Sequence, residues 1–403
     1  MLKEFLQGKS SKHINIKHVY QTIHRYGPIT KGKLIERTNL KQTTMVRILE
    51  QLLEWDLIEL NGYDESSGGR PPALYQINPR HHYMIGIDLS RTHTKIMLVN
   101  LALTPIDRVS FPMTAQHTPV YTIDLIKRTL EEMLQKHRLT DDDVLGIGIG
   151  AVGPLDRENG IILEPDYFPA TGWKHVAIVD ELKKVFPQKV LLENGAHVAA
   201  IGEYYHSTIP HENILYCISG IGLRCGILNN GQFVQNKTGD ASSFGQMIIH
   251  TGSESDSIGE TLSSFISLES ILEEVKDEVE QGKKSMLLEL VNGKMENSKI
   301  EHVLMALKQN DRLVREVIMK SAYYYGVGLA NIINVLHPDR VILSGILMHE
   351  FPPYYEKVME TAKQYIYRYH PEDVSFGKGE LKEDAVAIGA SVLIFDTFFN
   401  VSV

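Results

Sequence analysis

The pattern of apolar and polar residues near the N-terminus has the period of an α-helix. In the first such segment the apolar residues occupy positions i, i+3, i+4 and i+7: Ile16, Val19, Tyr20 and Ile23. This spacing predicts an amphipathic helix, which the pair Gly27-Pro28 should end. Thr30 can then cap a second helix, whose Leu34 and Ile35 face inward.

A third helix is predicted after a short break at residues 39–41. Its apolar residues repeat the same spacing: Met45, Ile48, Leu49 and Leu52. Three short helices joined by tight turns form the core of a helix-turn-helix domain. The start and the outer face of the third helix carry residues whose donors reach base edges and phosphates in a major groove: Gln42, Thr43, Thr44 and Arg47. We therefore expect this helix to bind DNA.

Two strand-like segments follow, at residues 57–60 and 73–77, and predict a β-hairpin, or wing. The loop between them ends in Gly68-Gly69-Arg70-Pro71-Pro72. A lone guanidinium on a narrow tip suits a minor groove, where negative potential is concentrated, so Arg70 is predicted to contact DNA. The alternative is a small helical domain with a solvated charged face.

Beyond residue 80, short apolar strands bounded by glycine alternate with helical segments. Strands are predicted at residues 83–90, 94–101, 107–113 and 144–150, with a helix at 121–136. Strand, helix and glycine turn recur near residues 189–195, 214–222 and 340–345. Residues 254–320 are mostly helical and charged. This alternation is typical of α/β layers, so we assign the body to the α/β class.

Charge divides the chain at the same place. Residues 1–80 hold 12 Lys and Arg against 8 Asp and Glu, a net charge of +4, whereas the other 323 residues hold 29 against 42, a net charge of −13. A small basic module on an acidic body indicates a head that binds a polyanion and a body with a separate task. With 403 residues, 43% of them hydrophobic, the chain can bury more than one core.

Membrane, secreted and metal-binding classes are not expected. No apolar run reaches the roughly 18 residues of a membrane span, and the polar N-terminus lacks a signal-peptide core, so the protein is expected to be cytoplasmic. Cys217 and Cys225 lie in apolar strand-like segments, which favours buried reduced thiols over a disulfide or a metal site. The 17 histidines form no spaced cluster with cysteines or carboxylates.

Five segments of the body follow one another in a family-specific order. They are Ile85-Gly86-Ile87-Asp88, the glycine-proline turn at residues 146–156, Gly172-Trp173 with Glu193-Asn194, Gly220-Ile221-Gly222, and residues 326–334 with 341–345. In this order they resemble the ROK family, bacterial sugar kinases and sugar-responsive repressors that share an actin-like, hexokinase-type (ribonuclease H-like) two-lobed ATPase fold. With the winged helix in front, the whole chain resembles the repressor branch, which includes xylose repressors.

The resemblance also implies a division into domains. A winged helix-turn-helix DNA-binding domain is expected at residues 1–80, and a sugar-kinase-like effector and oligomerisation domain at 81–403. The lobes of that second domain are expected at approximately 81–205 with 385–403, and at 206–384.

Departures from the kinase pattern decide the predicted function. Kinases of the family carry an aspartate, the general base for the sugar hydroxyl, where this chain has Gly195, so no proton can be taken there. Ser90 and Arg91 stand in place of two phosphate-loop glycines and obstruct a close backbone approach. Ser243 and Gln246 replace a sugar-binding Glu and a zinc-binding His, and no cysteines follow. We therefore expect no kinase activity, no cofactor and no metal.

Three residues remain of the family's sugar pocket, and the resemblance implies that they bind a ligand: Asn194, Glu269 and Gly153. Two of them have a structural alternative. Asn194 can serve as a turn residue before a helix, and Glu269 as a surface charge on a helix.

We therefore expect a sequence-specific transcriptional regulator, a sugar-responsive repressor of carbohydrate-utilisation genes. It should bind double-stranded DNA at an inverted-repeat operator as a homodimer or homotetramer, with a monosaccharide as effector. One alternative is an active ROK-type sugar kinase with a DNA-binding head, which Gly195 opposes. The other is a regulator whose body responds to a protein partner rather than a sugar, which Ser243 and Gln246 leave open.

Overall fold

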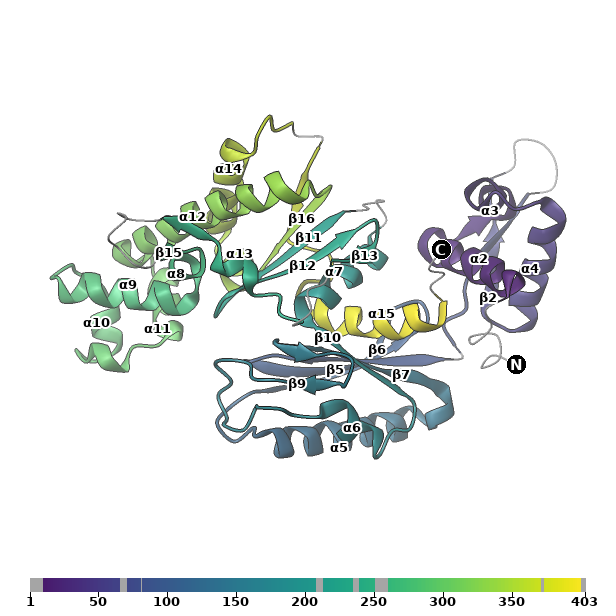
Figure 1. The fold of residues 1–403 in the computed structure, drawn as a ribbon, viewed down its shortest axis with the longest axis horizontal. Coiled ribbons are helices and arrows are strands. Elements are labelled where there is room, and N and C mark those ends of the chain that lie inside the picture. Colours follow the sequence, from purple (N-terminus) through teal and green to yellow (C-terminus); the bar gives the residue numbers. More distant parts are fainter. Residues whose placement is uncertain are drawn as a thin grey trace. The chain divides into compact units, whose positions relative to one another are not determined.

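The computed structural model describes residues 10–65, 71–80, 82–207, 213–234, 239–250, 260–370 and 373–399 (Figure 1). The chain divides into two compact units: Met1–Pro210 with Glu383–Val403, and His211–Lys382. These divisions lie close to the expected lobe boundaries near residues 205 and 385. The N-terminal head belongs to the first unit, together with the first lobe of the body.

Within the described part of the head, helices α2 (Ser11–Tyr26), α3 (Lys31–Thr38) and α4 (Gln42–Glu54) form at the three predicted places. Most of the apolar positions that predicted them are buried: Ile16, Val19, Tyr20, Ile23, Leu34, Met45, Ile48, Leu49 and Leu52. Ile35, which was also expected to face inward, is only half-buried. Gly27 follows the last residue of α2, and the Thr30 hydroxyl accepts a backbone N–H of the first turn of α3 at 3.3 Å. The three helices contact one another, so each buries one stripe of side chains.

Strands β2 (Ile58–Tyr63) and β3 (Ala73–Ile77) form the predicted hairpin. Strand β1 (Ile29–Thr30) pairs with β3 and completes a sheet of order β1-β3-β2. A strand of two residues has no alternation, so its sequence could not predict it. The predicted DNA contact Arg70 lies outside the described residues, as do residues 66–69.

In the body of the first unit, five of the described strands form a sheet of order β10-β7-β4-β5-β6. Their bounds are Tyr83–Leu89 (β4), His93–Asn100 (β5), Pro105–Pro112 (β6), Val144–Ala151 (β7) and Lys189–Asn194 (β10). β4, β7 and β10 are parallel, whereas β5 and β6 continue from β4 as an antiparallel meander. β8 (Leu155–Asp156) and β9 (Ile161–Ile162) form a separate small pair.

Helices cover both faces of this sheet (Figure 1). α5 (Pro119–His137) and α6 (Ile178–Lys183) lie on one face and share its apolar core. α7 (Gly195–His206) and α15 (Ala385–Phe399) lie on the other face. Because both faces are covered, β4 and β7 are buried along most of their length, as is typical of parallel strands in α/β proteins.

α15 lies directly on the sheet because two strand residues lack side chains. A Cβ on Gly86 of β4 would lie 1.8 Å from the backbone oxygen of Ala387, and one on Gly148 of β7 would lie 1.8 Å from that of Ala390. Only glycine allows such a close approach of helix and strand backbones. The glycine-rich strands of the sequence therefore position the C-terminal helix.

In the second unit, five of the described strands form another sheet, of order β13-β12-β11-β16-β17. Their bounds are Ile214–Ser219 (β11), Leu223–Asn229 (β12), Gln232–Phe233 (β13), Arg340–Ser344 (β16) and Ser375–Gly377 (β17). β14 (Ile248–His250) pairs with β15 (Glu260–Thr261). The helices are α8 (Ser263–Ile266), α9 (Leu268–Glu280), α10 (Leu287–Leu290), α11 (Ile300–Lys308), α12 (Arg312–Leu336), α13 (Ile346–Glu350) and α14 (Pro352–Tyr365).

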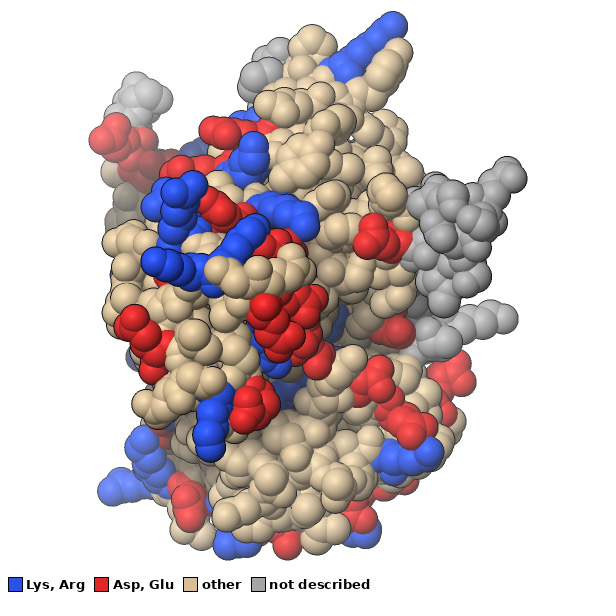
Figure 2. Space-filling view, turned by 90° about the vertical axis from the view of Figure 1, so that its left-hand side faces the viewer, with Lys and Arg blue, Asp and Glu red and all other residues tan. Residues whose placement is uncertain are grey.

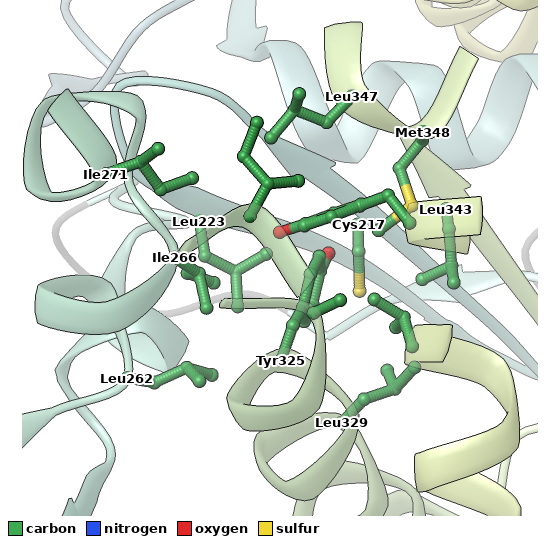
Figure 3. Packing of buried hydrophobic residues seen from close by; sticks show 14 of the residues in the cluster. Cys217, Leu223, Leu262, Ile266, Ile271, Tyr325, Leu329, Leu343, Leu347 and Met348 are labelled. Carbon is green, nitrogen blue, oxygen red and sulfur yellow. The ribbon is translucent and has the colours of Figure 1, made fainter. Parts of the chain in front are cut away.

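α12 supplies the centre of the second unit's core (Figure 3). Its Tyr325 is fully buried among apolar side chains of the sheet and of α8. Cys217 and Cys225 face each other on β11 and β12 with their sulfur atoms 3.5 Å apart, and both are fully buried. The prediction that these thiols are buried is confirmed. Burial raises the pKa of Cys225, which leaves it protonated and unreactive.

The surface of the second unit carries both signs of charge. Over the face that holds α9 to α11, lysines and arginines lie among aspartates and glutamates (Figure 2). Ion pairs such as Lys276–Glu273 and Lys320–Glu274 connect them. A mixed surface of this kind does not attract a polyanion. In the part of the chain that the structure describes, no helix combines the length and the apolar character of a membrane span.

Candidate functional site

Helix α4 presents the predicted DNA-binding residues at the surface of the head. Gln42, Thr43 and Arg47 are exposed and Thr44 is partly exposed, whereas the apolar stripe of the helix faces the core. Lys41 precedes α4 without capping it through its side chain. The N–H groups of the first turn therefore lack a side-chain acceptor and suit a phosphate.

Two residues of α2 that the apolar pattern did not identify lie beside this face. Lys12 and Asn15 border a hollow of about 180 Å³ with residues of α4: Thr44, Arg47, Ile48 and Gln51. An ammonium group and an amide add donors next to Arg47, as contacts to a DNA backbone require. The signal that identifies them is the i, i+3 spacing of polar residues on the outer side of α2.

The candidate ligand residues of the first unit meet at the carboxyl edge of its sheet. Asp88 in β4 and Glu193 in β10 stand opposite the same residue of β7, and Asn194 stands opposite the last residue of that strand. Gly153 follows two residues later, in a buried turn. Ligands of open α/β sheets bind at this edge. The structure thus brings Asn194 and Gly153 together where a ligand is expected.

Asn194 also has the structural role that was its alternative. It is fully buried, and its side-chain oxygen accepts the N–H of Ala196 at 3.0 Å, which caps α7. Glu193 is buried as well. Its carboxylate accepts the N–H of Asn194 (2.7 Å), Nδ1–H of His197 (3.0 Å) and a guanidinium N–H of Arg157 (3.3 Å). Asn194 therefore holds the start of α7 in place at the edge of the sheet.

In the turn between β4 and β5, backbone N–H groups form hydrogen bonds within the turn itself. The sequence resemblance aligns this turn with the first phosphate loop of the kinases. The Ser90 hydroxyl accepts the N–H groups of Thr92 (3.4 Å) and His93 (3.1 Å), and the N–H of Ser90 donates to the His93 oxygen (3.0 Å). Arg91 extends to a neighbouring loop, where its Nε–H donates to the backbone carbonyl oxygen of Asp166 at 2.7 Å. A phosphate cradle needs outward-pointing N–H groups, and these three are engaged within the turn.

Asp88 is engaged by a residue that the sequence did not identify. Its Oδ2 lies 3.1 Å from Nε2 of His93, on the adjacent strand. The hydrogen bond to Asp88 raises the pKa of His93, and burial acts in the opposite direction. The imidazole occupies a carboxylate oxygen that the metal of a nucleotide would need, so Asp88 is poorly suited to hold that metal.

Three other residues that the sequence singled out lie in the second unit: Glu269, Ser243 and Gln246. Glu269 is exposed in the first turn of α9, where a carboxylate favours the helix N-terminus. Ser243 and Gln246 are exposed at the two ends of a 3₁₀ turn, Ser243–Gln246. Within the described ranges, no three His, Cys, Asp or Glu side chains are placed to hold a metal ion. Residues 251–259, part of the stretch compared with the zinc site, lie outside those ranges.

The sequence is similar to a known protein family and to characterised members of it. The ROK family pattern matches residues 84–397. A xylose repressor of Caldicellulosiruptor bescii is 26% identical over 392 residues, which cover 96% of this chain and 97% of that protein.

Two solved structures are similar to the whole chain or to its body. A ROK family transcriptional regulator, a homologue of the E. coli MLC protein, has a TM-score of 0.76 at 22% identity and covers 96% of this chain and 97% of its own. A ROK family glucokinase from Streptomyces griseus, in complex with glucose and AMPPNP, has a TM-score of 0.63 at 21% identity, over 77% of this chain and 98% of its own. These likenesses confirm the predicted α/β class and the two-lobed hexokinase-type fold.

Proposed function

Because the chain belongs to the ROK family, we propose that it is a sequence-specific DNA-binding repressor that responds to a sugar. The main support for this proposal is the exposure of Gln42, Thr43 and Arg47 on helix α4 of the basic head. Similarity to a xylose repressor along 96% of the chain supports the same role. The protein would act in the cytoplasm, where its operator is found.

The head would bind one half-site of an operator. α4 enters the major groove, with Lys12 and Asn15 directed to the adjacent backbone and Arg70 of the wing directed to a minor groove. A homodimer presents two such heads related by a two-fold axis, and the operator is then an inverted repeat.

The body would bind a monosaccharide at the carboxyl edge that holds Asn194 and Gly153. A repressor needs a difference in sugar affinity between its DNA-bound and free states, not turnover, so the loss of the catalytic base at Gly195 is compatible with this role. A relative that matches along 96% of this chain is a xylose repressor, so xylose is the first sugar to test.

Sugar binding at Asn194 has a measurable consequence. We expect D-xylose or another monosaccharide to raise the melting temperature of the wild-type protein, because a ligand that binds only the native state stabilises it. Asn194→Ser should remove this shift and keep the start of α7 capped, since serine also caps helices. The measurement is thermal unfolding with a panel of monosaccharides.

The matched control is Asn331→Ser, on the exposed side of α12, which should keep the full sugar-dependent shift. A full shift in Asn194→Ser would place the sugar elsewhere. If no sugar of the panel shifts the wild type, the body responds to a protein partner instead.

We also infer that the protein has no sugar kinase activity. Gly195→Asp restores the position of the missing base, yet it should not create activity, because the β4–β5 turn engages its own N–H groups and Asp88 is bonded to His93. The measurement is sugar-dependent ADP formation by the wild type and the variant. Robust phosphorylation of a hexose or pentose by the wild type would establish the kinase alternative.

A further inference from the structure

The head and the body of the first unit are joined by a packed contact, which we name the head–body seam. Its residues come from one helix of the head and two helices of the body: Tyr20, His24 and Arg25 of α2, Tyr204 and Tyr205 of α7, and Phe395, Asp396 and Phe399 of α15. Because α2 also belongs to the core of the head, the seam ties the position of α4 to the body.

Aromatic rings fill the seam. Tyr20 stacks on Phe399 with ring centroids 4.4 Å apart and lies 6.1 Å from Phe395. All three side chains are fully buried. Large, fully buried aromatic rings contribute much of the energy of protein interfaces. The packing of these three rings therefore stabilises the contact between the head and the body.

Polar groups complete the seam at its edge. Arg25 donates to the Tyr204 hydroxyl at 2.8 Å, and its guanidinium carbon lies 4.6 Å from the centroid of the same ring. The Tyr205 hydroxyl donates to the Asp396 carboxylate. A guanidinium is attracted to the face of an aromatic ring, so this contact depends on how the two groups are oriented. The seam therefore favours one orientation of the head.

The two body helices of the seam form a rigid pair. A Cβ on Gly389 of α15 would lie 1.6 Å from the backbone oxygen of Val198 in α7, and one on Gly202 of α7 would lie 3.0 Å from the backbone of Gly389. α7 begins directly after Asn194 and ends at the seam tyrosines. Since close-packed backbones transmit displacement rather than absorb it, a shift of α7 at its Asn194 end reaches the seam.

We propose that the head–body seam transmits the effector signal: the docked head is the DNA-competent state, and a sugar at the Asn194 edge weakens docking through α7. This inference rests on the proposed function, because it takes the head to bind DNA and the body to bind a sugar. It requires a docked and an undocked state for which the sugar has different affinities.

The docked state favours DNA binding because it fixes the position of each head. In a homodimer with two fixed heads, binding of one head to its half-site places the other head close to the second half-site. The effective concentration of that second head is then high. An undocked head is connected to the body through the covalent chain alone. The effective concentration of the second head at its half-site is therefore lower. Undocking should therefore weaken binding to a two-half-site operator and leave binding to a single half-site unchanged.

His24 gives the seam a pH dependence. Its ring lies 4.6 Å from Phe395 and 5.9 Å from Tyr205, and its Nε2 donates to the Leu101 oxygen at 3.1 Å. Burial lowers the pKa of His24 to about 4, while the bond to Leu101 acts in the opposite direction. Its Nδ1 is buried without a hydrogen-bond partner. Protonation therefore favours the undocked head.

An undocked His24 has its ordinary pKa of roughly 6.5, so docking is at full strength above that pH and weakens as pH falls below it, by roughly tenfold at about pH 5.5. The other ionisable groups of the seam are Tyr20, Arg25, Tyr204, Tyr205 and Asp396. Imidazole is the side chain whose ordinary pKa lies in this window.

The experiment removes one seam ring from the body side. Phe399→Ala leaves every residue of the head unchanged. The matched control, Phe265→Ala, removes a ring that stacks on Tyr324 at 4.0 Å in the second unit. For each protein we would measure the hydrogen-exchange protection of α2 amides, with and without sugar, and the affinity for a two-half-site operator and for one half-site.

Phe399→Ala should lower α2 protection and weaken binding to the full operator by roughly 5- to 150-fold, with half-site binding unchanged. It should also lose the sugar response, whereas Phe265→Ala should keep all three properties. In the wild type, α2 protection factors should fall between about pH 7.5 and 5.5, and His24→Gln should abolish this fall. These results together support the seam as the transmitting element.

Other results overturn it. Operator binding by Phe399→Ala that equals or exceeds that of the wild type shows that docking does not favour DNA. A sugar that releases DNA from the wild type without lowering α2 protection overturns the seam alone. Absence of sequence-specific DNA binding by the wild type overturns the proposed function, and the role of the seam with it.

Discussion

Replacing Arg47 by alanine is expected to weaken operator binding by about 1–3 kcal/mol and to relax the preference for one base pair. Arg47 is exposed on α4 beside Lys12 and Asn15, so its removal leaves the core intact and should change stability by less than about 0.5 kcal/mol. The measurement is titration of operator DNA at fixed salt, repeated with each base pair of the half-site varied.

The control for the lost charge is Arg312→Ala. This side chain is 91% exposed in the second unit and pairs with Glu316. Its removal changes the net charge by the same amount and should leave operator affinity unchanged. Equal affinity and equal sequence preference in the two variants would remove Arg47 from the DNA interface.

Replacing Gly389 by alanine is expected to destabilise the protein by about 3 kcal/mol or more. The new Cβ would lie 1.6 Å from the backbone oxygen of Val198, and no side-chain rotation can relieve a clash between backbones. α7 and α15 would have to separate, which opens the packing beneath the head–body seam. Thermal or urea unfolding of the variant measures the loss.

Gly32→Ala is the control for the glycine substitution itself. A Cβ at this helical position of α3 would meet only the Thr30 hydroxyl at 3.9 Å. Alanine favours a helix more than glycine does, so this variant should be neutral or more stable by up to about 1 kcal/mol. Equal stability of Gly389→Ala and the wild type would mean that α7 and α15 are not in backbone contact.

Much of the fold could be predicted because its signals are local. The three helices of the head follow from the spacing of their apolar stripes, and the wing strand Ala73–Ile77 from its own composition. The strands β4, β7, β10, β11 and β16 follow from apolar runs that end in polar or glycine residues. Strands of two residues, such as β1 and β13, carry no periodicity and could not be found.

The head–body seam could not be predicted because it joins distant parts of the chain. Tyr20 and Phe399 are nearly 380 positions apart, and each fits its own helix pattern equally well with or without the other. The same holds for His93, whose role depends on the register of two strands that brings it to Asp88. Pair contacts of this kind appear only once the sheet and its covering helices are in place.

The site residues were predictable in kind but not in their contacts. Asn194 was expected either to bind a ligand or to precede a helix, and the structure shows the helix cap. The sugar contact of Asn194 and the DNA contacts of Gln42, Thr43, Thr44, Arg47 and Arg70 remain predictions. Donor groups of these kinds serve both folding and binding, and only a measured ligand separates the two roles.

The proposed function joins two properties: the protein binds a specific DNA sequence, and it releases that DNA in response to a sugar. Its most direct test is to select bound fragments from a random DNA pool with the wild-type protein, and then to measure the fraction that remains bound after D-xylose, glucose or another monosaccharide is added. We expect an inverted-repeat sequence that is released by at least one monosaccharide. Recovery of no common sequence, or of a sequence that every sugar leaves bound, would contradict it.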